Sequence, residues 1–128
     1  MERWKQELQL VEGVYGALNL GLNLEWFSIT YWKLPPGWNK AETTVLVQIP
    51  PGYPVTPPDN FYTENDLTLA NGQQPGNSSV NQTVAGKMWR MFSYHVESGD
   101  WHPQADPMRG HNLLTFLYGV AKRLAEVS

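Results

Sequence analysis

The side chains most able to carry out acid–base chemistry are three histidines and an aspartate. His95, His102 and His111 fall within seventeen residues, and Asp100 lies among them. Histidine titrates near neutral pH, so His95 held by a carboxylate such as Asp100 could act as a general base or a nucleophile. Alternatively, His95 could be buried and hydrogen-bonded, fixing the loop before the last helix. We expect the structural role, because polar groups packed among aromatic rings must be hydrogen-bonded in any case.

The histidine spacing does not favour a metal site. Six residues separate His95 from His102, and eight separate His102 from His111. Zinc ligands that local structure brings together lie four apart on a helix or in a short knuckle, so these three would meet only through the tertiary fold. We expect neither a metal ion nor another cofactor.

Composition and charge exclude several other kinds of function. Nine basic and twelve acidic residues give a formal charge of −3, without the basic excess that nucleic-acid binding requires. No apolar run approaches the ~20 residues that span a bilayer, and the N-terminus mixes charges, so we expect a cytoplasmic protein that does not bind membranes. The 128 residues contain no cysteine, which excludes thiolate chemistry. Their number fits a single domain, residues 1–128.

The elements that position these residues are indicated by hydrophobic spacing. Apolar residues at helical spacing predict a short N-terminal helix that stops at Gly13. Residues 24–32 then alternate with period two, which predicts a strand with Phe27, Ile29 and Tyr31 on one face. A helix followed by a half-buried strand therefore opens the chain.

Three further strands are predicted. Residues 43–49 alternate in the same way and should pair antiparallel with the first strand, while 61–63 and 67–69 are shorter candidates. Residues 71–82 are polar and offer a core almost nothing, so they predict a mobile loop. The predicted sheet is therefore an antiparallel meander of three or four strands.

Prolines mark a long loop in the middle of the chain. Seven of the ten prolines lie within residues 35–58, and residues 50–58 are too rich in proline for a helix interior or a central strand. We expect a rigid, extended loop here. Because aromatic and proline neighbours favour the cis form, we also expect one cis peptide bond within residues 50–58.

A long helix is predicted to end the chain. Asp106 is the expected N-cap, followed by Pro107 at the first helical position, and apolar residues continue at helical spacing. The order of helix, antiparallel strands, loop and helix indicates an α+β domain. The predicted core consists of Phe27, Ile29, Val45, Val47, Leu113, Leu117 and Leu124.

The proline-rich segment resembles a signature of ubiquitin-conjugating enzymes. Residues 53–58, Tyr-Pro-Val-Thr-Pro-Pro, are followed by Phe61, like the tyrosine-proline, double-proline and aromatic pattern that leaves the central meander of those enzymes. Residues 89–95 and Trp101 are similar to the divergent prokaryotic conjugating-enzyme family E. The resemblance covers roughly residues 15–124 and implies the fold of ubiquitin-conjugating enzymes.

One position departs from the usual chemistry of those enzymes. The run Gly86-Lys87-Met88-Trp89 falls where they place a glycine, two residues and the catalytic cysteine, so the resemblance puts Trp89 in the nucleophile's position. The usual His-Pro-Asn tripeptide has no counterpart between Thr63 and Met88. We take Trp89 as natural, since so large a ring in place of a cysteine would overpack a shallow site by about 1–3 kcal/mol.

Three functions stay open. The first is a non-catalytic partner in a bacterial ubiquitin-like modification system, for which the resemblance implies a ubiquitin-like protein, an activating enzyme and a JAB-type isopeptidase as companions. The second is an enzyme with other chemistry, using His95 or, as an acceptor of the modifier, Lys87. The third is a stand-alone structural module. For the first, two exposed loops, residues 35–38 and 50–58, are the candidate contacts, and the partner-binding candidates on them are Trp38, Tyr53, Pro54, Pro57 and Pro58.

Overall fold

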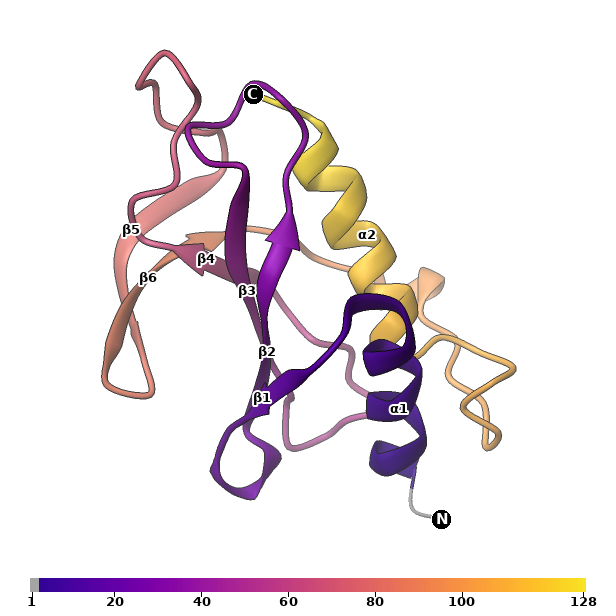
Figure 1. The fold of residues 1–128 in the computed structure, drawn as a ribbon. Helices are drawn as coiled ribbons and strands as arrows, with labels where there is room; N and C mark the ends of the chain where they lie inside the picture. Colours follow the sequence, from indigo (N-terminus) through magenta and orange to yellow (C-terminus); the bar gives the residue numbers. More distant parts are fainter. Residues whose placement is uncertain (1–2) are drawn as a thin grey trace.

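A computed structural model describes residues 3–128, apart from the side chain of Ser98, as one antiparallel sheet with two helices (Figure 1). Its six strands are ordered β1-β2-β3-β4-β6-β5, and every pair is antiparallel. The elements are α1 (Arg3–Tyr15), β1 (Leu18–Leu20), β2 (Trp26–Lys33), β3 (Glu42–Gln48), β4 (Phe61–Glu64), β5 (Ser78–Val84), β6 (Lys87–Phe92) and α2 (Leu113–Ala125). The α+β class, the antiparallel sheet and the terminal helices are confirmed.

The core lies between one face of the sheet and the two helices, which pack side by side (Figure 1). All seven residues predicted for the core are buried. The stacked rings of Phe61 and Phe92, with centroids 4.9 Å apart, add a pair that joins β4 to β6. Leu46, Tyr62, Val84 and Trp89 form a separate buried cluster. Three of its strands, β3, β4 and β6, also supply residues to the main core.

Strand β2 shows why strict alternation fails. The register between β2 and β3 shifts between Ile29 and Trp32, so a β-bulge interrupts the alternation. Phe27 and Ile29 face the core as predicted, but Tyr31 is 74% exposed and Trp32 is buried in its place. The expectation that Tyr31 shares the core face is therefore wrong.

The polar segment predicted as a mobile loop contributes an edge strand instead. Residues 78–84 form β5, which pairs with β6 through the two-residue turn Ala85-Gly86. Both turn residues have positive φ, 52° and 77°, as hairpin turns of this length require. The prediction of three or four strands missed this hairpin because β5 has almost no apolar face. Residues 67–69 form no strand, although Leu69 makes one bridge to Trp38.

Both helix ends differ from their predicted positions for local reasons. Helix α1 continues past Gly13 to Tyr15 and ends at Gly16, whose φ of 87° suits the left-handed residue after a helix. Helix α2 is capped by Asn112, which accepts a hydrogen bond from the N–H of Thr115 in a reciprocal capping box. Asp106 caps only a preceding turn through the N–H of Met108. Neither helix is long and apolar enough to cross a membrane within residues 3–128.

Truncation of a core residue on α2 tests this packing. Leu117→Ala should lower the free energy of unfolding by about 2–5 kcal/mol, because Leu117 is fully buried and the change leaves a cavity. Its neighbour Tyr118 is exposed, so Tyr118→Ala should cost less than about 1 kcal/mol. Chemical denaturation of both variants measures the difference, and equal losses would contradict the core assignment.

Candidate functional site

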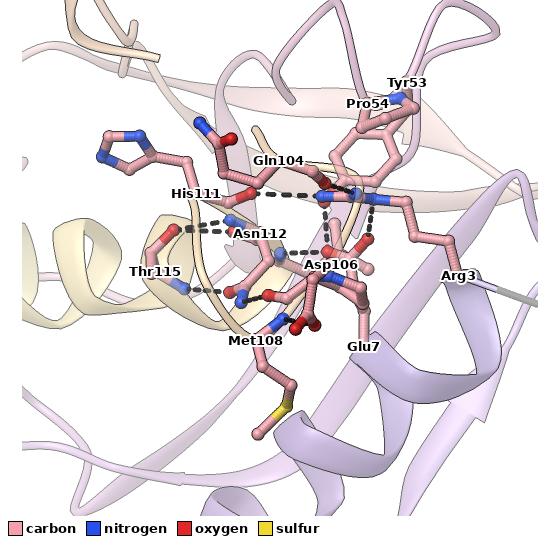
Figure 2. A network of polar contacts seen from close by, with 12 residues as sticks. Arg3, Glu7, Tyr53, Pro54, Gln104, Asp106, Met108, His111, Asn112 and Thr115 are labelled. Carbon is pink, nitrogen blue, oxygen red and sulfur yellow. Dashed lines mark hydrogen bonds and ion pairs between the residues drawn. The ribbon is translucent and has the colours of Figure 1, made fainter. Parts of the chain in front are cut away.

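A buried carboxylate links the two helices to the proline-rich loop (Figure 2). Glu7 on α1 is fully buried. Its Oε1 accepts the N–H of Leu113, at 2.7 Å, and the O–H of Tyr53, while its Oε2 lies 2.7 Å from Nε of Arg3. Each oxygen thus has a donor, as a buried charge requires.

The partners of Glu7 extend this network in two directions. The guanidinium of Arg3 also donates to the carbonyl oxygens of Gln104 and His111, which tie the segment before α2 to α1. Burial, together with the hydrogen bond to Glu7, raises the pKa of Tyr53 far above its usual range, so the phenol stays a donor. Glu7 also lies at the N-terminus of α2, where a negative charge is favourable.

The proline-rich loop is anchored at its tyrosine and exposed beyond it. The Tyr53–Pro54 peptide bond is cis, which confirms the expectation for this segment. Trp101 donates from Nε1 to the carbonyl of Pro54 at 2.7 Å. Pro57 is half-buried and Pro58 buried, whereas Val55 between them and Tyr53 is 82% exposed.

A shallow hollow of about 410 Å³ lies beside this loop. It is lined by Trp4, Asn23, Leu24, Glu25, Ile49, Pro50, Pro51 and Tyr53. Trp38 was also predicted to bind a partner. Its ring is buried against Phe92, and its Nε1 donates to the carbonyl of Leu124 at 2.9 Å. Trp38 therefore closes the edge of the core and is not available as an exposed anchor.

Trp89, which the sequence resemblance places at the nucleophile's position, is a packing residue. Its ring is 5% exposed, lies in the cluster with Tyr62 and Val84, and donates from Nε1 to the carbonyl of Val84 at 3.2 Å. The ammonium of Lys87 sits 4.7 Å from the ring centroid, a cation–π contact on an exposed side chain. Lys87 also lines a hollow of about 230 Å³ with Glu64.

His95 is exposed, so the expectation that it is buried is wrong. Its side chain is 63% exposed, and Nδ1 lies 2.5 Å from Oδ1 of Asp59. Asp100, the carboxylate suggested by the sequence, belongs to a short 3-10 turn after β6 and is exposed. The backbone N–H of Asn60 donates a hydrogen bond to the carbonyl of Tyr94 at 2.7 Å. This contact lies next to the last β4–β6 pair, Phe61 with Phe92, and brings Asp59 close to His95. Asp59 lies 36 positions before His95, and only the pairing of β4 with β6 joins them, so no local sequence signal identified it.

The other two histidines meet each other. His102 donates from its backbone N–H to Nδ1 of His111 at 2.8 Å, and the ring centroids are 5.9 Å apart. Because Nδ1 of His111 accepts, a neutral ring carries its proton on Nε2. His111 also stacks on Trp101, with centroids 5.4 Å apart. Within the described part of the chain, no group of three or more acidic, histidine or cysteine side chains could hold a metal ion.

Comparison with known proteins gives one match. Residues 20–126 match the family model described as Prokaryotic E2 family E. No curated protein and no solved structure matches the chain. The matched region contains strands β2 to β6, the proline-rich loop and α2.

Removing the charge of Glu7 tests the central network. Glu7→Gln should lower the free energy of unfolding by about 1–3 kcal/mol, because an amide turns a donor toward Arg3 or toward Tyr53 and the N–H of Leu113. The control is Glu12→Gln on the same helix, where the side chain is exposed and a change of about 0.5 kcal/mol or less is expected. Thermal melts at neutral pH that shift equally for both variants would contradict the role of Glu7.

Proposed function

We propose that this chain, which belongs to Prokaryotic E2 family E, serves a bacterial ubiquitin-like modification system as a binding or scaffold partner. One observation carries the proposal: the 128 residues include no cysteine, and Trp89, which the resemblance puts at the nucleophile's position, is a buried packing residue. A thioester with the modifier needs a thiolate, so this chain cannot carry one. The fold can still offer a surface for binding partner proteins.

Family membership supports the kinds of partner. The proposed partners are the activating enzyme and the ubiquitin-like protein, with a JAB-type isopeptidase in the same system. We place the contact on the exposed part of the proline-rich loop around Val55 and on the adjoining hollow, because exposed apolar side chains beside a rigid loop lose little entropy on binding. Tyr53 and Pro54 hold that loop in place.

A second function is favoured by the exposure of His95. With Nδ1 held by Asp59, Nε2 is the nitrogen left to take a proton or to accept an acyl or phosphoryl group. Lys87, exposed above Trp89, could instead accept the modifier's C-terminus as an isopeptide. Both alternatives would make the chain an enzyme or an acceptor, whereas a stand-alone structural module would bind neither partner.

Partner capture tests the main proposal. Purified wild-type chain should retain the activating enzyme or ubiquitin-like protein encoded in the same genome. Val55→Asp should weaken capture at least about tenfold, since a charge replaces an exposed apolar contact. The control Val14→Asp changes another exposed valine, which lines a different hollow with Tyr15 and Trp32. Retention of neither partner would leave the structural module, and equal losses in both variants would refute the loop as the contact.

Substitution of His95 tests the enzymatic alternative. His95→Gln should change the free energy of unfolding by no more than about 0.5 kcal/mol, because the side chain is largely exposed. Partner capture and any conjugate seen on gels after reconstitution should also be unchanged, and the same holds for Asp59→Asn. A variant that melts like wild type but no longer forms conjugates would establish non-thiol chemistry at His95.

A further inference from the structure

The least expected buried side chain is a positively charged one on β6. Arg90 is 2% exposed and shares its face of the sheet with Phe92. Its Nη1 donates to Oγ of Ser78 at 2.9 Å, and its Nη2 donates to Oε1 of Gln74. Both acceptors are neutral, and no carboxylate among residues 3–128 forms an ion pair with Arg90. Burial lowers the pKa of this guanidinium, as expected for a cation that has lost water without gaining a counter-ion.

One donor of this guanidinium has no acceptor. Nε of Arg90 is the one buried side-chain nitrogen or oxygen of the described residues that lacks a hydrogen-bond partner. Nε and Nη2 form the edge of a guanidinium that presents two parallel N–H groups to one planar, two-oxygen acceptor. The amide of Gln74 supplies one oxygen to this edge, on Nη2. A carboxylate would supply both oxygens and the missing charge.

Arg90 lines a hollow that can admit such a group. The hollow measures about 580 Å³ and is otherwise lined by Asn65, Asp66, Thr68, Gln74, Ser78, Ser79 and Val80. Gln74 is an exposed side chain, so its displacement needs only a rotamer change. Asp66 does not supply the counter-ion, because its carboxylate lies 2.6 Å from Nζ of Lys40.

We propose that this hollow is a carboxylate-binding site, with Arg90 as its anchor, and that its ligand is the C-terminal end of a peptide chain. A single guanidinium beside an aspartate suits one negative charge better than the two of a phosphate. The lining is made of amides and hydroxyls, which can pair with peptide groups. β5 is the outermost strand of the sheet, so one of its edges pairs with no other strand and can receive an extended segment.

The Nε–H resonance of Arg90 reports the site directly in the wild-type protein. In a titration followed by NMR, N-acetyl-glycyl-glycine with a free carboxylate should move this resonance saturably. The same peptide with a C-terminal amide should not move it. Acetate should need at least about tenfold higher concentration, because it lacks the peptide groups.

Each other result of the titration overturns a stated part of the proposal. No movement with the free acid, or equal movement with the amide, overturns the site. An equal response to acetate overturns the assignment to a peptide end. A stronger response to phosphate overturns the choice of a carboxylate.

A built-in carboxylate provides the matched variant. Gln74→Glu should place a carboxylate on Nη2 and Nε of Arg90, raise Tm by about 2–4 °C and weaken the response to the free acid at least about tenfold. Gln73→Glu adds the same charge at the neighbouring exposed residue, whose side chain bonds Asn71, and should change neither. A Gln74→Glu variant with unchanged Tm and unchanged peptide response would overturn the proposal.

Discussion

The arrangement of the two helices and the proline-rich loop depends on the buried carboxylate of Glu7. Apolar packing is non-directional and would tolerate small shifts of α1 over the sheet. A buried charge is less tolerant, because each missing donor costs the desolvation energy of the group. The donors to Glu7 come from Tyr53, Leu113 and Arg3, in three separate segments. The folded state must therefore place the loop and the start of α2 against α1, or Glu7 loses the donors from Tyr53 and Leu113 and keeps only Arg3 of its own helix.

This constraint gives a structural meaning to the tyrosine-proline signature. The hydroxyl of Tyr53 faces inward to Glu7, and the carbonyl of Pro54 accepts from Trp101. Tyr53 and Pro54 are thus engaged within the chain, and the exposed large apolar side chain between Pro51 and Pro57 is Val55. The signature therefore fixes the position of the loop, while the surface that a partner could touch is left to residues outside it.

The sequence predicted elements with an apolar face and missed features set by polar pairing across the chain. The cores of β2, β3 and α2 follow from periodic residues such as Val45 and Leu117, because burial alone selects them. β5 has a polar sequence, and only its pairing with β6 makes it a strand. His95 was expected to be buried because aromatic residues surround it in sequence, but β6 ends at Phe92 and the chain then leaves the sheet. The burial of Arg90 was not predicted, because a charged residue is expected at the surface. Arg90 lies two residues before Phe92 on β6, so it shares the buried face of the strand despite its charge.

The same alternation accounts for the burial of Trp89. Along β6, Arg90 and Phe92 face the helices, so Trp89 falls in the other buried cluster, with Leu46, Tyr62 and Val84. A thiol buried among apolar side chains has a raised pKa and is inert, so this position suits a large apolar ring better than a nucleophile. Trp89 fills that cluster and satisfies its own N–H on Val84, which makes it part of the packing that holds the β5–β6 hairpin. That hairpin carries Ser78 and Arg90, so Trp89 supports the strand pair that positions the buried guanidinium of the proposed carboxylate site.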